Sequence, residues 1–196
     1  MSPDAEKVKR PMIVIVHGGP FSASPYQMFL AGRHYYLQAG YNLLIINYRG
    51  SIGYGKQLMH SLLGQIGVND VHDCGELTLK AISHFSDRID ENKVGLTGGS
   101  HGGFLTGWLT GHPKYKDIWR ASVTRNAVYD MNYMNAQTDI PDWIHACVFG
   151  EQIDLAQITK EQVATIYERS PISVVHNVQC PSCIMIGDVD LRVPPA

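Results

Sequence analysis

The sequence predicts an α/β protein with a mostly parallel sheet and helices on both faces. Short β-branched or aliphatic runs alternate with longer segments of helical spacing along the chain. Within residues 71–85 the apolar side chains recur every three or four positions, as on one face of a helix that packs on a sheet. The 196 residues contain no repeat and no low-complexity linker, and a chain of this length suits one domain.

Four strands are expected, and each is followed by a loop at the carboxyl edge of the sheet. The strands are PMIVIV at 11–16, YNLLIINY at 41–48, KVGLT at 93–97 and PSCIMIGD at 181–188. The helices between them are expected over residues 29–40, 71–85 and 102–111. Since active residues gather where parallel strands end, the loops after these four strands form the candidate site.

The charge balance argues against nucleic-acid and membrane partners. Sixteen basic and eighteen acidic residues give a formal net charge of −2, which leaves no broad basic field for phosphates. The longest apolar runs are far shorter than the roughly 20 residues that span a bilayer. The N-terminal MSPDAEKVKR does not fit an export signal, and four cysteines without a regular framework indicate reduced thiols. We therefore expect a cytoplasmic protein.

No metal or other cofactor is expected. Asp70, His72 and Asp73 stand at a predicted helix start, where acidic side chains complement the helix dipole without a metal. Cys180 and Cys183 form a C-x-x-C pair, but they lead into a strand and not into a helix. Core and loop cysteines are therefore the preferred interpretation.

The central motif is GLTGGSHGGF at 95–104. Gly98, Ser100 and Gly102 fit the pattern G-x-S-x-G between an expected strand and an expected helix. In such a turn the serine is strained and its hydroxyl points outward, while the flanking glycines let strand and helix close together. Ser100 is therefore a candidate nucleophile. The alternative is a glycine-rich turn in which Ser100 only caps the helix.

Two further loops contain candidate partners for Ser100. In HGGP at 17–20, the N–H group of Gly18 or Gly19 suits an oxyanion hole together with the N–H of His101. GDVDLRVPP at 187–195 contains Asp188 and Asp190, either of which fits the acid that orients a protonated histidine. An exposed turn rich in aspartate is the alternative for this loop.

The remaining loop, RGSIGYGKQ at 49–57, raises a competing hypothesis. Gly50, Gly55 and Lys56 fit the phosphate-binding pattern G-x-x-x-x-G-K. Gln57 stands where that pattern requires Ser or Thr to bind magnesium. Nucleotide binding is therefore the less favoured hypothesis.

Seven motifs in a fixed order carry a resemblance to a known family. They are HGGPF at 17, NYRGSIGYG at 47, GLTGGSHGGFLTGWL at 95, TRNAV at 124, TDIPDW at 138, SPI at 170 and GDVDLRVP at 187. From about residue 11 to the last residue, the chain resembles the acylaminoacyl-peptidases of the prolyl oligopeptidase family. The resemblance implies an α/β-hydrolase fold, no cofactor, a possible homo-oligomer, and hydrolysis of short N-acylated peptides to release the N-acyl amino acid.

The resemblance also implies roles for individual residues. Ser100 corresponds to the nucleophile, and Asp190 rather than Asp188 to the acid, because Asp190 begins the family's D-x-R-V-P motif. Arg192 corresponds to an arginine that binds a substrate carbonyl. Tyr54 aligns with a tyrosine whose hydroxyl contributes to the oxyanion hole in prolyl oligopeptidase. Asp139 and Asp142 belong to TDIPDW, which either shapes the pocket or forms a packed surface loop.

The family places its catalytic histidine after the aspartate, whereas all nine histidines of this chain precede Asp190. We therefore expect residues 1–196 to be a partial α/β-hydrolase catalytic domain, truncated at both ends. The family's N-terminal β-propeller and the C-terminal segment with the histidine would be absent, and the fragment by itself would be inactive. The alternative is a non-catalytic truncated relative that binds a peptide or a partner.

Overall fold

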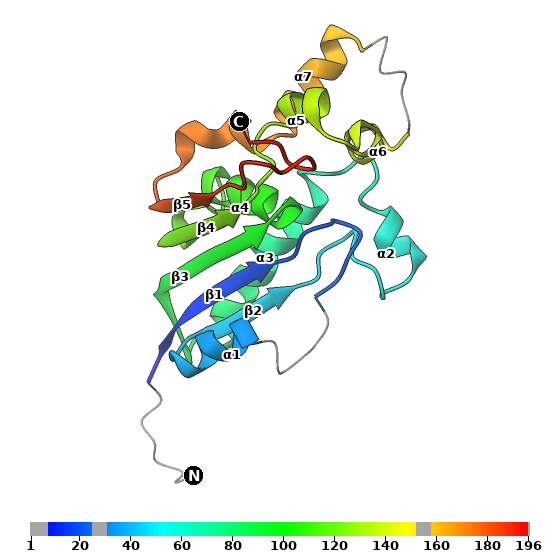
Figure 1. Cartoon of the computed structure of the whole chain (residues 1–196). Helices are drawn as coiled ribbons and strands as arrows, with labels where there is room; N and C mark the ends of the chain where they lie inside the picture. The colour runs from blue at the N-terminus through cyan, green and yellow to red at the C-terminus, as the bar shows by residue number, and fades with distance from the viewer. Residues whose placement is uncertain (1–7, 25–30, 152–157, 196) are drawn as a thin grey trace.

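A single parallel sheet forms the centre of the molecule (Figure 1). The computed structural model describes residues 8–24, 31–151 and 158–195. The strands are β1 (Arg10–Val16), β2 (Asn42–Ile46), β3 (Ile89–Gly99), β4 (Ala121–Arg125) and β5 (Ser182–Met185). Their order in the sheet is β2-β1-β3-β4-β5, and every neighbouring pair is parallel. The predicted parallel α/β sheet is confirmed.

Helices lie on both faces of this sheet. They are α1 (Ala31–Gln38), α2 (Lys56–His60), α3 (Asn69–His84), α4 (His101–Gly111), α5 (Met131–Gln137), α6 (Pro141–Phe149) and α7 (Lys160–Glu168), with 3-10 helices η1 (Lys116–Ile118) and η3 (Pro171–Asn177). Figure 1 shows α1 on one face and α3 with α4 on the other. All three predicted helices are present, although positions 29 and 30 of the first lie outside the described residues. The structure adds β4, α2 and the group α5–α7, which the sequence analysis did not identify.

Helix α4 is the central buried element. Ten of its eleven residues are buried, because it packs against β3, β4 and η3. Glycines permit this packing. A Cβ at Gly103 would lie 2.4 Å from the Ala127 side chain, and one at Gly111 would lie 2.5 Å from the Val174 carbonyl oxygen. The N-terminus of α4 is thereby held at the carboxyl edge of the sheet.

The sequence analysis did not predict strand β4, because the side chains that ASVTR buries are polar. Ser122 and Thr124 are buried, whereas Val123 on the opposite face is 36% exposed. The buried hydroxyls are satisfied: Ser122 donates to the Ser182 hydroxyl at 2.8 Å, and Thr124 pairs with the Tyr129 hydroxyl at 2.6 Å. Buried and exposed side chains alternate as in other strands, but here the polar side chains are buried and the valine is exposed.

The described residues contain neither a membrane-spanning helix nor a metal-binding cluster. None of the described helices combines the length and the apolar character needed to cross a bilayer. In the same part of the chain, no cluster of three or more His, Cys, Asp or Glu side chains is placed to hold a metal ion. The four cysteines are unpaired, with Cys74 and Cys147 buried and Cys183 exposed.

Candidate active site

Ser100 occupies a strained turn between β3 and α4. Its backbone has φ 56° and ψ −125°, a conformation that non-glycine residues rarely adopt. A Cβ at Gly98 would lie 2.3 Å from the Gly102 carbonyl oxygen, and one at Gly102 would lie 2.3 Å from the Val16 carbonyl oxygen. The G-x-S-x-G spacing is therefore a steric requirement of this turn. Ser100 stands at the N-cap, yet its side chain makes no capping hydrogen bond, so the interpretation as a simple helix cap is wrong.

The glycine loop after β1 lies directly beside this turn. A Cβ at Gly18 would be 3.0 Å from the Gly99 carbonyl oxygen and 3.3 Å from the Ser100 Cβ. The N–H of His101 begins helix α4, where N–H groups have no intrahelical acceptor and the helix dipole favours negative charge. The structure thus brings Gly18 and Gly19 together with the amino end of α4.

Asp190 is held by three donors in the loop after β5. Its Oδ1 accepts from the N–H groups of Arg192 at 2.9 Å and Val193 at 3.0 Å, and its Oδ2 accepts from Asn126 Nδ2. The bond from the Val193 N–H contributes most to lowering the pKa of Asp190, with further lowering from Arg192 and Asn126. The carboxylate is therefore ionised at neutral pH. Asp188 is exposed and has no hydrogen bond among the described residues.

Asn126 is a site residue that the sequence analysis did not identify. It follows β4 with φ 44°, and its backbone N–H donates to the Met185 carbonyl oxygen at 2.8 Å. This places its side-chain amide against Asp190. The available signal was a polar residue at the carboxyl end of a strand, but that strand itself was not predicted.

Arg192 pairs with Asp139 in a bidentate contact. Arg192 Nε and Nη2 donate to the two carboxylate oxygens of Asp139 at 2.6 and 3.0 Å. The loop between α5 and α6 is also tied to this segment by its backbone and by Thr138, whose hydroxyl donates to the Arg192 carbonyl oxygen at 2.8 Å. The guanidinium lowers the pKa of Asp139. TDIPDW therefore packs on the loop that contains Asp190, while Asp142 stands in the first turn of α6.

Most of the predicted site residues border one cavity of about 330 Å³. Its walls are formed by Gly19, Phe21, Ser100, His101, Val128, Met134, Ile140, Trp143, Arg192 and Val193. Apolar side chains from α5, α6 and the segment after β4 form an apolar wall of this cavity. The apolar wall was missed because these elements were not predicted.

Tyr54 is not among the residues that border this cavity. Its side chain is 59% exposed, and its hydroxyl accepts a hydrogen bond from Asn47 Nδ2 at 2.7 Å. The structure therefore does not bring the Tyr54 hydroxyl to Ser100.

No histidine of the described residues forms a hydrogen bond with Ser100 or Asp190. The His17 ring donates to the Gly18 carbonyl oxygen at 2.7 Å and accepts from the Ser51 hydroxyl at 2.8 Å. His101 pairs with Asp70 at 2.9 Å. The described site thus contains Ser100, Asp190 and the N–H groups at the amino end of α4, but no histidine that is hydrogen-bonded to Ser100 or Asp190.

Known proteins resemble this chain closely in sequence and in structure. The prolyl oligopeptidase family matches residues 28–196. The acylamino-acid-releasing enzyme of Arabidopsis thaliana is 40% identical over 187 residues, which cover 94% of this chain and 24% of that protein. The human enzyme of the same name is 34% identical over 194 residues, covering 96% and 25% respectively.

The structural comparison gives the same result. The uncomplexed acylaminoacyl peptidase of Pyrococcus horikoshii has a TM-score of 0.83 at 26% identity, over 98% of this chain and 29% of that one. An acylaminoacyl peptidase in complex with Z-Gly-Gly-Phe-chloromethyl ketone has a TM-score of 0.83 at 25% identity, covering 99% and 29%. This chain spans about a quarter of the length of the curated relatives it matches. With its parallel sheet, its helices on both faces and the Ser100 turn, the chain has an α/β-hydrolase fold and belongs to the prolyl oligopeptidase family.

Proposed function

We propose that this chain contains the nucleophile, the acid and the oxyanion donors of a serine peptidase that releases N-acyl amino acids from short N-acylated peptides. The observation that carries the proposal is the Ser100 turn, strained at φ 56°, at the border of a cavity of about 330 Å³. The substrate class is supported by relatives named acylamino-acid-releasing enzymes, at 34% and 40% identity.

In the proposed reaction Ser100 Oγ attacks the carbonyl carbon of the acylated residue. A histidine base takes the hydroxyl proton and then gives it to the leaving amine, and water hydrolyses the acyl-enzyme in a second step. The N–H of His101 and that of Gly18 or Gly19 stabilise the tetrahedral oxyanion. A contribution from the Tyr54 hydroxyl would require it to leave Asn47, to which it is hydrogen-bonded at 2.7 Å.

The base comes from outside residues 1–196 in this proposal. Asp190 is ionised and oriented by the N–H groups of Arg192 and Val193 and by Asn126. A carboxylate held in this way can fix the tautomer of a histidine and stabilise its protonated form. The short chain is then inactive by itself.

The cavity indicates how the substrate is selected. Val128, Met134 and Trp143 form an apolar wall of the cavity that Ser100 borders, which favours an apolar side chain on the acylated residue. Arg192, oriented by Asp139, donates to a substrate carbonyl oxygen. A cytoplasmic location remains part of the proposal and is supported by the four unpaired cysteines. Homo-oligomerisation remains a proposal that rests on the family resemblance.

The two aspartates of the last loop are expected to differ in their effect on turnover. In the full-length protein, Asp190→Asn should lower kcat by about 10⁴, because the base loses the carboxylate that orients it. Asp188→Asn should leave kcat within about twofold, because Asp188 is exposed and unbonded among the described residues. Initial rates on an acetylated aminoacyl anilide measure both. Equal losses in the two variants would refute the assignment of Asp190.

Arg192→Ala is expected to lower kcat/KM by roughly 10- to 100-fold, the effect of losing a charge-assisted hydrogen bond to the substrate. Arg120→Ala is the matched control, because Arg120 is exposed directly before β4 and its guanidinium donates to the Asp117 carbonyl oxygen at 3.0 Å, away from the cavity. Steady-state kinetics on the same anilide test both variants. A specificity constant for Arg192→Ala equal to that of the control would contradict the proposed role.

A further inference from the structure

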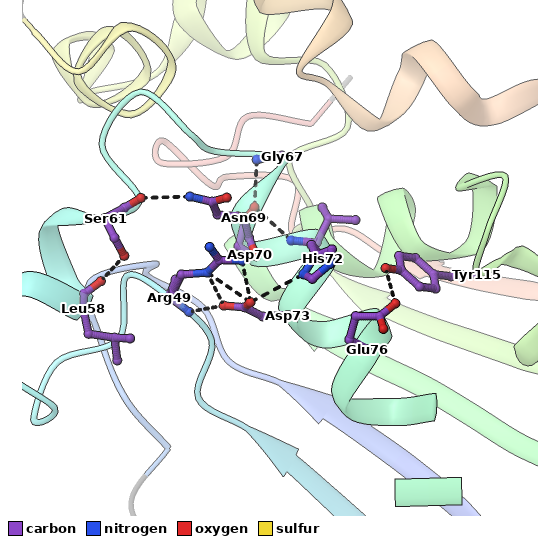
Figure 2. Close-up of polar contacts among 11 residues, drawn as sticks. Arg49, Leu58, Ser61, Gly67, Asn69, Asp70, His72, Asp73, Glu76 and Tyr115 are labelled. Atoms are coloured by element: carbon purple, nitrogen blue, oxygen red, sulfur yellow. Dashed lines mark hydrogen bonds and ion pairs between the residues drawn. The ribbon is translucent and has the colours of Figure 1, made fainter. Parts of the chain in front are cut away.

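Asp70 and His101 form a fully buried pair behind the candidate active site. Their side chains are 0% and 1% exposed, and His101 Nε2 donates to Asp70 Oδ2 at 2.9 Å. The other carboxylate oxygen, Asp70 Oδ1, accepts from the N–H groups of Gly67 at 2.8 Å and Val71 at 3.0 Å. Figure 2 shows Asp70 at the start of α3, bonded to Gly67. Asp70 therefore does more than complement the helix dipole.

Stability alone does not explain this pair. Burying an ionised group and its partner costs desolvation energy that their attraction often only offsets. In addition, His101 Nδ1 is buried and has no hydrogen-bond partner among the described residues, which is unfavourable for a polar atom. A pair of apolar side chains would avoid both costs. The arrangement is therefore better explained by the orientation that it gives to residue 101.

The orientation of residue 101 matters because it directly follows the nucleophile. The His101 ring stacks on Phe104 with centroids 4.9 Å apart and lies edge-on to Trp143 at 6.0 Å. Stacking alone allows two ring orientations that differ by a half-turn about the Cβ–Cγ bond, whereas the hydrogen bond from Nε2 to Asp70 selects one of them. A fixed ring fixes the first backbone unit of α4, and its N–H is the proposed oxyanion donor.

Tyr48 connects this half of the oxyanion hole to the other half. The centroid of its ring lies 5.7 Å from that of the His101 ring and 4.4 Å from that of the His17 ring, on which it stacks. Its hydroxyl donates to the His17 carbonyl oxygen at 2.7 Å, directly before Gly18. Burial, together with the nearby Asp70 charge, raises the pKa of Tyr48 well above its usual value, so the hydroxyl stays protonated as a donor. Tyr48 therefore contacts both the residue before the glycine loop and the first residue of α4.

We infer that Asp70 is a positioning residue of the oxyanion hole: through its hydrogen bond to the buried His101 ring, it sets the place of the His101 backbone N–H beside Ser100. The inference rests on the proposed function, because it requires an oxyanion to form at Ser100. Asp70 touches neither Ser100 nor the cavity, so it acts on the transition state and not on substrate binding.

The test is Asp70→Ala in the full-length protein. Loss of an oxyanion donor costs roughly 10²- to 10³-fold in kcat, so a displaced donor should lower kcat by about 10- to 100-fold. KM should stay within about twofold, since no substrate contact is lost. Asp70→Asn should recover most of the rate, because its amide can donate to His101 Nε2 once the ring proton moves to Nδ1. Steady-state kinetics on an acetylated aminoacyl anilide measure both variants.

The matched control is Glu76→Gln, farther along α3. Glu76 accepts from the Tyr115 hydroxyl at 2.8 Å (Figure 2) and from Lys114, and it does not border the cavity. This change should leave kcat within twofold while it removes an ion pair from the same helix. The inference is wrong if Asp70→Ala folds and keeps kcat within twofold, or if Asp70→Asn is as slow as Asp70→Ala.

A double variant tests the inference if Asp70→Ala does not fold, and a labelling experiment tests it if the parent protein does not cleave the anilide. If Asp70→Ala does not fold, Asp70→Leu combined with His101→Phe replaces the pair by apolar side chains. A folded double variant with parental kcat overturns the inference, and one at least tenfold slower supports it.

If the parent does not cleave the anilide, the substrate proposal fails. The labelling rate of Ser100 by a fluorophosphonate then decides. In that reaction the base takes the Ser100 hydroxyl proton, Oγ bonds phosphorus, fluoride leaves, and the phosphonyl oxygen needs the same N–H groups.

Discussion

Ser100→Ala in the full-length protein is expected to abolish hydrolysis of an acetylated aminoacyl anilide. Removing the serine of a catalytic triad lowers kcat by about 10⁶, since no other hydroxyl can form the acyl-enzyme. Alanine adopts the backbone conformation of Ser100 at φ 56° about as readily as serine does, so the turn gains no new strain. We therefore expect the melting temperature to change little. Initial rates and thermal unfolding measure the two effects separately.

Ser61→Ala is the control for this substitution. The Ser61 hydroxyl donates to the Leu58 carbonyl oxygen at 2.7 Å at the end of α2, and Ser61 does not border the cavity. Its variant should retain parental turnover. Normal turnover by a folded Ser100→Ala protein would show that another group is the nucleophile and would remove the basis of the proposed function.

Residues 1–196 expressed alone are expected to hydrolyse the anilide, and to react with a fluorophosphonate, several powers of ten more slowly than the protein expressed from its complete coding sequence. A serine hydroxyl is a weak nucleophile without a base, and loss of a triad histidine costs about as much as loss of the serine, roughly 10⁶ in kcat. Among the described residues, no histidine is hydrogen-bonded to Ser100 or Asp190, and the rings of His17 and His101 are bonded to other groups.

The comparison uses both proteins at equal concentration, with circular dichroism to confirm that each is folded. Folding must be checked because Ile184, Met185 and Ile186, on the last strand of the described sheet and just after it, are more than half exposed, and an apolar edge strand promotes aggregation. Rapid Ser100-dependent labelling of the folded short chain would contradict the expectation. His17→Gln and His101→Gln would then identify which ring serves as the base.

Several features of this protein could be predicted from the sequence because their physical causes are local. Strands such as PMIVIV and NLLII are runs of β-branched and aliphatic residues, and α3 has an apolar face of helical period. The Ser100 turn is local in part. Gly98 is required by a contact between residues four apart, because its Cβ would lie 2.3 Å from the Gly102 carbonyl oxygen, whereas Gly102 is required by the Val16 carbonyl oxygen of β1.

The tertiary structure decided the partners of these local elements. Asp70 and His101 are 31 residues apart in the sequence, Arg192 and Asp139 are 53 apart, and Asn126 and Asp190 are 64 apart. Such pairs depend on which strands become neighbours and on which loops then meet at one edge of the sheet. Periodicity does not contain that information, because it reports only the face that a segment buries.

The sequence by itself determined the fold class, the strand–turn–helix around Ser100 and the loops that converge on it. Only the tertiary structure showed that β4 buries serine and threonine, which are satisfied by Ser182 and Tyr129 from other segments. It alone brought α5 and α6 over the site to form the apolar wall. The physical reason is that a buried polar group is stable when it finds a partner, and the partners here come from distant parts of the chain.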